Sequence, residues 1–299
     1  MNRLRYPCVL GALLLAAACS GGRPTPPQAL PSPVPATHLV PETMNIVARA
    51  DWKRAGEAGV REDLLAWMRT AQLSERMIDV LRGCLPRSSE LVVALRSSRA
   101  GFEGDAVVIA RLSPDDASRA PESVPCSAKG WRPLREERGL RLFEPEHPSA
   151  ERPEPALIAA DQEAVAIASQ AAADWLLRIV HDGPDPDRLR PPDKPLVALD
   201  ARLGPDALPD NLRGRSPVIA DLARGLEHVR VQIEIAESVR VRSALSYAAA
   251  QDAKAAGVLL TRLRPGFLSS EKKGWSEAAR SSHAALSDTV LRLTFEIPR

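Results

Sequence analysis

The feature that most constrains the fold is the alternation of apolar and polar residues in three segments of the second half of the chain. Segments 229–235, 239–247 and 291–297 carry an apolar residue at nearly every second position, with arginine, glutamine, glutamate, serine or threonine between them. Successive side chains of a strand point to opposite faces, so each segment predicts a strand with one apolar and one polar face, which is typical of antiparallel sheets. Helices predicted over 216–225, 248–263 and 275–286 would cover the apolar face.

The first half of the chain predicts a similar mixture of strands and helices. Apolar residues at helical spacing indicate one helix over 60–82, closed by Gly83 and Pro86. Residues 164–169 either begin the next helix, which carries Trp175, or complete a hairpin that turns at Asp161 and Gln162; we favour the hairpin. The fold class expected is α+β, with antiparallel sheets and helices packed on one face. The remaining strands are predicted at 44–50, 91–95, 106–112, 139–143 and 156–160.

The two halves predict the same order of elements. Strands 44–50, 91–95 and 106–112 correspond to 196–203, 229–235 and 239–247, which suggests two tandem β-α-β-β-α modules, although residue identity between them is low. Residues 183–195 are rich in proline and charge, so we expect a linker there between a first half over 38–182 and a second half over 196–299. The aspartates near this linker do not have the spacing of a calcium loop.

The amino terminus has the composition of a secretory signal. Arg3 and Arg5 precede an apolar stretch over 9–15, which ends in three alanines and Cys19. The stretch is too short to span a bilayer, which takes about 20 apolar residues. An ordinary secreted protein with an incidental cysteine would fit these features too.

Residues 1–19 resemble the lipobox segment of bacterial lipoproteins, with Ala16 where leucine is usual. The resemblance implies cleavage between Ala18 and Cys19, which leaves 1–18 as signal peptide, and a diacylglyceryl group on the Cys19 sulfur. It also implies membrane attachment through this lipid anchor, since two or three acyl chains hold a protein stably to a bilayer. Ser20 stands where an aspartate would favour the inner membrane in enterobacteria, so the location expected is the outer membrane, facing the periplasm.

Residues 19–37 contain six prolines and hardly any large apolar side chain. Such a sequence favours extended polyproline geometry, at about 3.1 Å per residue, and is interpreted as a semi-rigid tether between the lipidated cysteine and the folded part. A proline-rich docking peptide is the alternative interpretation.

Two cysteines remain once Cys8 is removed with the signal and Cys19 is acylated. Cys84 and Cys126 are predicted to form a disulfide, because paired cysteines are the rule in oxidising compartments. Two free thiols or a redox site are the alternatives, and the redox site is disfavoured because the chain has no Cys-x-x-Cys spacing.

Charge excludes one class of partner. Without Arg3 and Arg5, 38 of the 40 Lys and Arg residues remain, and they equal the 38 Asp and Glu residues. Nucleic-acid binding depends on neutralising phosphates, so a chain of formal charge near zero without a basic block is not expected to bind nucleic acid.

No motif predicts a catalytic, cofactor or metal site. The chain has no Gly-x-Ser-x-Gly elbow, no His-Glu-x-x-His and no glycine-rich phosphate loop, and its five histidines are scattered. Among the tryptophans, Trp67, Trp175 and Trp275 occupy amphipathic helices and are predicted in the core. Trp52 and Trp131 have polar, loop-like neighbours and are the candidates for an exposed recognition patch, with burial as the alternative.

Three function classes therefore remain. The first is a non-catalytic binding or structural lipoprotein of the cell envelope, with an envelope protein as a possible partner, and it is the one we favour. The second is a carrier that holds a lipid or other apolar ligand between helices and a one-sided sheet. The third is a hydrolase whose catalytic residues are dispersed along the sequence.

Overall fold

The alternating segments of the second half are strands, as predicted. In the computed structural model they form β9 (Leu226–Ile235), β10 (Ser238–Tyr247) and β12 (Val290–Pro298). Strand β10 pairs antiparallel with β9 on one side and with β12 on the other, so their apolar residues stand on one face of the sheet.

The structure describes residues 34–71, 73–98, 101–113, 126, 129–149, 154–182, 195–203, 217–269 and 273–298. The predicted signal peptide, Cys19, most of the tether and residues 183–194 of the predicted linker lie outside these ranges. Residues Pro33–Arg299 belong to one compact unit. The last tether residues are already part of this unit, because Val34 and Ala36 are buried and Ala36–His38 forms a short 3-10 helix, η1.

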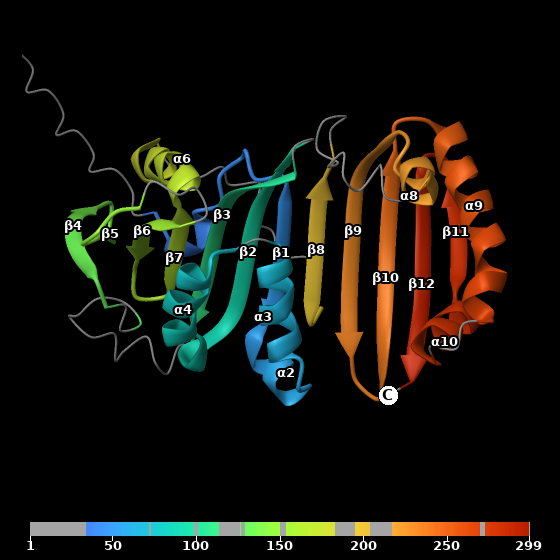
Figure 1. Ribbon diagram of the computed structural model, residues 1–299, viewed down its shortest axis with the longest axis horizontal. Helices are drawn as coiled ribbons and strands as arrows, with labels where there is room; N and C mark the ends of the chain where they lie inside the picture. Colours follow the sequence, from blue (N-terminus) through green and yellow to red (C-terminus); the bar gives the residue numbers. More distant parts are fainter. Residues whose placement is uncertain are drawn as a thin grey trace, which may run out of the picture. The chain divides into compact units, whose positions relative to one another are not determined.

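The described strands form a single antiparallel sheet in the order β11-β12-β10-β9-β8-β1-β2-β3-β7-β6-β5-β4 (Figure 1). The two predicted halves meet in this sheet, because β1 of the first half pairs with β2 on one side and with β8 of the second half on the other. The hairpin at Asp161 is confirmed, since β6 pairs with β7. The further strands are β1 (Ile46–Asp51), β2 (Ser88–Ser98), β3 (Gly101–Leu112), β4 (Trp131–Glu137), β5 (Leu140–Pro145), β6 (Pro155–Ala160), β7 (Ala164–Ser169), β8 (Val197–Arg202) and β11 (His283–Ser287).

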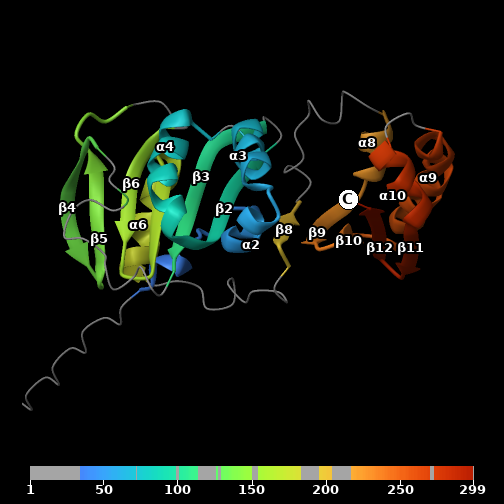
Figure 2. The same cartoon turned by 90° about the horizontal axis from the view of Figure 1, so that it is seen from below.

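We call the sheet surface that carries Ala48, Val93 and Leu199 face A, and the surface that carries Arg49 and Val92 face B. Face A bears helices in both halves (Figure 2). In the first half these are α2 (Trp52–Glu57), α3 (Arg61–Thr70) and α4 (Glu75–Cys84), and in the second α8 (Pro217–Leu222), α9 (Ala250–Leu268) and α10 (Lys273–Ser281).

The prediction that helices pack on one face of the sheet is correct only for the second half. In the first half, face B is also covered, by η1 and α6 (Gln170–Asp182), whose Leu176 and Val180 are fully buried. The strands beneath α6 are apolar on both faces, as in β7, where every residue is buried. Burial on both faces is the reason why these strands lack the alternation seen in the second half.

The single helix expected over 60–82 is two helices. Ala71 ends α3, and the Ser74 hydroxyl accepts the backbone N–H of Met77 at 3.1 Å and so caps the start of α4. The 3-10 helix η2 (Leu85–Arg87) follows directly.

The disulfide between Cys84 and Cys126 is confirmed. It closes a separation of 42 residues and holds Cys126 against the end of α4, with Cα atoms 4.6 Å apart. Cys84 is fully buried in the face A core. A side chain at Gly83 would collide with the carbonyl oxygen of Cys126, so glycine is needed for this close approach.

Candidate functional site

An apolar groove lies on face A where β1 meets β8. Its volume is about 230 Å³, below the roughly 300–1,000 Å³ of sites that enclose a drug-sized ligand. Apolar cavities of about 150 Å³ already bind benzene-sized molecules, so the groove has room for a short apolar group. It is lined by Ala48, Arg49, Ala50, Leu64, Trp67, Met68, Leu91, Val93, Val197, Leu199, Val231 and Ile233.

Strand register explains the shape of the groove floor. Directly paired residues form two apolar rows across four strands: Val93, Ala48, Leu199 and Val231 in one, and Leu91, Ala50, Val197 and Ile233 in the other. Each row has alanine on β1 and larger side chains on the neighbouring strands. The two alanine methyl groups leave the floor low along β1, and the larger residues rise on either side of it.

Helix α3 forms one wall of the groove through Leu64, Trp67 and Met68. Met68 is buried beneath the helix, whereas Trp67 is 36% exposed. The prediction that Trp67 is a core residue is therefore wrong. Its indole belongs to the rim of an open groove, because α3 covers β1 and β2 without reaching over β8.

The second half leaves the other side of the groove open. Between β8 and β9 the described helix is α8, which has six residues and packs against α9, away from the groove. Val197, Leu199, Val231 and Ile233 consequently remain partly exposed.

The groove offers almost nothing to a polar ligand. Strands β1, β2, β8 and β9 all have neighbours on both sides, so their backbone groups are used in the sheet. The lining side chains are hydrocarbon or thioether groups apart from the Trp67 indole and Arg49, whose side chain lies on face B by register. Such a surface binds by apolar contact and has no group for acid, base or nucleophilic chemistry.

The two tryptophans predicted for recognition are both buried, so that prediction is wrong. Trp52 is 2% exposed and begins α2, with the Arg61 guanidinium over its ring at 5.2 Å, while its indole N–H has no hydrogen-bond partner within the described residues. Trp131 is 4% exposed at the start of β4. Both pack in the face A core, so burial, the alternative interpretation, is correct. Their polar sequence neighbours did not indicate it.

The residues that make the groove are not among the site residues that the sequence predicts. Ala48, Ala50, Val197 and Leu199 belong to strands that were predicted, and small residues at alternating positions of β1 are a visible signal. These small residues form a groove only because β1 pairs with β8, which is remote in sequence.

One polar cluster bears on the hydrolase class. His228 Nε2 lies 2.9 Å from Asp200 Oδ1 on face B, Arg230 donates to the same carboxylate at 3.2 Å, and Ser246 stands opposite His228 in the register of β9 and β10. No hydrogen bond joins Ser246 to His228 in the described structure, and none of these residues lines the groove. The cluster therefore lacks the contact between nucleophile and base that acyl transfer requires.

Within the described ranges, no group of three or more His, Cys, Asp or Glu side chains is arranged to bind a metal ion. The described helices also include none that is both long and apolar enough to cross a membrane.

The fold class is α+β, built on one antiparallel sheet. No protein-family model matches the chain, and no curated protein matches its sequence. Among solved structures, crystal forms I, III and IV of TP0453 are similar to 89% of this chain and to 93, 94 and 94% of theirs. Their TM-scores are 0.48, 0.45 and 0.44, with sequence identities of 12, 14 and 14%. A likeness of this size assigns neither an activity nor a site residue.

Proposed function

We propose that the protein is a lipid-anchored, non-catalytic binding protein of the cell envelope, and that its folded part binds a hydrocarbon chain in the face A groove. The observation that carries the proposal is the groove itself, an open apolar cavity between α3 and the paired strands β1 and β8. Its occupant is a lipid acyl chain or a ligand with a comparable apolar tail.

A hydrocarbon chain fits the groove better than a peptide segment does. A bound peptide would bring backbone N–H and C=O groups, and burying each of them without a hydrogen bond is energetically unfavourable. The floor strands have no free edge here to pair with a peptide. A methylene chain brings no such groups and contributes roughly 0.8 kcal/mol for each CH₂ buried.

The apolar surface also continues beyond the cavity. In the row that contains Ile233, the next residues across the sheet are Val241 on β10 and Phe295 on β12, and both are partly exposed. A chain longer than the cavity can therefore remain in contact with apolar residues along this row.

Anchoring through Cys19 forms the second part of the proposal. It rests on the lipobox resemblance and on the proline-rich sequence that follows it. Cells supplied with alkyne palmitate should label the wild-type protein and not Cys19→Ala, and the unlabelled variant should leave the membrane fraction. Equal labelling of both proteins would contradict lipidation at this residue.

Binding in the groove is tested by titrating the purified protein with a fluorescent fatty acid. Ala48→Leu adds a branched side chain to the low part of the floor, and overpacking of this kind should weaken binding by about 1–3 kcal/mol. Ala285→Leu makes the same chemical change at an exposed position of β11 and should leave the affinity unchanged. Saturable binding that is equal in wild type and Ala48→Leu would show that the ligand binds elsewhere.

We further propose that the two halves are tandem β-α-β-β-α modules. Support comes from the strand order, which reads β1-β2-β3-β7-β6 outward on one side of the central pair and β8-β9-β10-β12-β11 on the other. The outer pairs match as well, because β7 and β12 each follow their outer neighbour in the chain and return to lie beside β3 and β10. In this arrangement the groove lies at the junction of the modules and is lined by both.

A further inference from the structure

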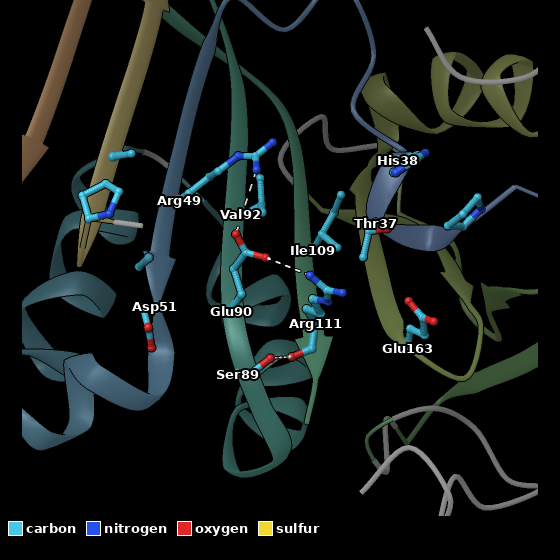
Figure 3. Close-up of a pocket in the computed structure, with 14 residues that line it drawn as sticks. Thr37, His38, Arg49, Asp51, Ser89, Glu90, Val92, Ile109, Arg111 and Glu163 are labelled. Atoms are coloured by element: carbon cyan, nitrogen blue, oxygen red, sulfur yellow. Dashed lines mark hydrogen bonds and ion pairs between the residues drawn. The ribbon is translucent and has the colours of Figure 1, made fainter. Parts of the chain in front are cut away.

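A second cavity lies on face B, on the opposite side of the sheet from the groove. Its volume is about 590 Å³, within the range of small-molecule sites. Figure 3 shows three charged side chains across its floor: Arg49 from β1, Glu90 from β2 and Arg111 from β3. The segment of η1 that contains Thr37 and His38 lies along one side.

The Glu90 carboxylate stands between the two arginines at long range. One carboxylate oxygen is 4.0 Å from Arg49 Nη1, and the other is 4.0 Å from Arg111 Nη1. Hydrogen bonds between N–H and oxygen have donor–acceptor distances of about 2.7–3.2 Å, so both contacts are ion pairs without a hydrogen bond.

The N–H donors of the two guanidinium groups therefore make no hydrogen bond to Glu90. Each carries five N–H donors, and within the described structure neither side chain donates a hydrogen bond to the protein. Only 16% of the Arg49 side chain is exposed, yet its guanidinium group keeps contact with solvent, and a half-buried charged group ordinarily has hydrogen-bond acceptors around it. A ligand in the cavity is in a position to supply them.

Charge favours an anionic group between the arginines. Arg49, Glu90 and Arg111 together carry one net positive charge, which a singly charged oxyanion neutralises. Asp51 and Glu163 also line the cavity and keep their negative charges: Asp51 accepts the Arg54 backbone N–H at 2.9 Å and caps α2, and Glu163 is exposed to solvent. The attraction for an anion therefore comes from the arginine pair itself and not from the lining as a whole. Arginine pairs suit carboxylate and phosphate oxygens because a guanidinium binds them in bidentate fashion.

The remaining floor is apolar. Val92 and Ile109 are paired two positions along β2 and β3 from Glu90 and Arg111, which makes them the next pair on face B, and Ala198 lies opposite Arg49 on β8. A bare inorganic ion would leave this surface and most of the cavity unused.

We propose that the face B cavity binds a small organic oxyanion, a carboxylate or a phosphate monoester. Its charged group lies between Arg49 and Arg111, and its apolar body lies over Val92 and Ile109. This site is separate from the groove on face A and takes a ligand of different chemistry.

Calorimetric titration of the purified protein tests the proposal with two pairs of probes, benzoate against acetate and phenyl phosphate against inorganic phosphate. Within at least one pair the larger member should bind more tightly, and the better pair tells a carboxylate site from a phosphate site. Arg49→Gln and Arg111→Gln should each weaken that binding about tenfold or more, since hydrogen bonds to charged groups are lost. Arg292→Gln removes the same charge from an exposed position on face B of β12 and should not change it.

Glu90→Gln distinguishes a binding site from a merely structural ion pair. Removing the carboxylate that competes for the arginines should increase the affinity several-fold, a gain that misfolding cannot produce. The proposal is overturned if no probe binds, if binding survives unchanged in Arg49→Gln and Arg111→Gln, or if Glu90→Gln weakens it.

Discussion

Small side chains have large effects at several positions of this protein. Ala48 and Ala50 keep the groove floor low, and Gly83 lets the end of α4 approach Cys126. In each case the residue matters through the space that it leaves. That role depends on a segment that is remote in sequence, β8 for the two alanines and Cys126 for Gly83. Local sequence patterns therefore predict the strand or the helix, but not the contact between the remote segments.

Gly83→Ala should destabilise the protein by about 1–3 kcal/mol, because the added Cβ collides with the Cys126 carbonyl oxygen and forces the disulfide or the helix end to move. Chemical unfolding of the oxidised protein measures this change. Gly266→Ala is the matched control within α9, where a new Cβ meets no atom within 4 Å. It should stabilise the helix by about 0.5–1 kcal/mol, and a similar effect of both substitutions would contradict the packing described at Gly83.

Tyr247 is predicted to make stability depend on alkaline pH. Its side chain is buried in the core beneath α9, and burial, with a smaller contribution from Asp252, raises its pKa from 10.0 to about 12. The unfolded chain loses this proton near pH 10 and the folded protein keeps it until about pH 12, so the free energy of unfolding falls as the pH rises through this window. The loss amounts to at most about 3 kcal/mol.

Ultraviolet titration can follow this group alone, because the second tyrosine of the chain, Tyr6, belongs to the predicted signal peptide. Tyr247→Phe should abolish the fall in stability between pH 10 and 12. At neutral pH the same variant should lose about 1 kcal/mol, since the hydroxyl donates to the Leu222 carbonyl at 3.1 Å. An ordinary titration midpoint near pH 10 in the folded protein would refute the effect of burial.

At the scale of elements, helix ends depend on single polar groups. The break between α3 and α4 is fixed by Ser74, whose hydroxyl caps the second helix. Ser74→Ala should reduce the free energy of unfolding by about 1 kcal/mol. Thr70→Ala, at the exposed end of α3, removes a hydroxyl that bonds only to its own helix and should change stability by less than about 0.5 kcal/mol. Urea unfolding compares the two, and equal losses would argue against the cap.

Strands with one solvent-exposed face could be predicted well from the sequence. Segments 229–235, 239–247 and 291–297 all lie within strands because alternation survives wherever one face meets solvent. Strand β11 lies where the sequence pattern predicts the end of a helix over 275–286, so that part of the prediction is wrong. The α10 helix stops at Ser281, whose hydroxyl donates to the Glu296 carbonyl at 2.6 Å and accepts the Glu296 N–H at 2.8 Å. The helix therefore ends at a contact between residues 15 positions apart, which a local sequence pattern does not predict.

At the scale of the whole described unit, the pairing of β1 with β8 decides the architecture. It joins the two predicted halves into one sheet and creates the apolar groove on face A at their junction. The sequence indicates both strands, yet edge and central strands look alike when the partner is about 150 residues away. For the same reason the strands that carry the groove residues could be predicted, while the site that these residues form together could not.

Binding of a hydrocarbon chain at this junction is the central proposal for the function of the protein. The most direct measurement is photo-crosslinking of the purified protein with a diazirine-bearing fatty acid, followed by mass spectrometry of the labelled peptides. Labels are predicted on α3 and β8, at Leu64, Trp67 or Leu199, and should be lost in Ala48→Leu and retained in Ala285→Leu. Labels confined to other elements, or unaffected by Ala48→Leu, would contradict the proposed site.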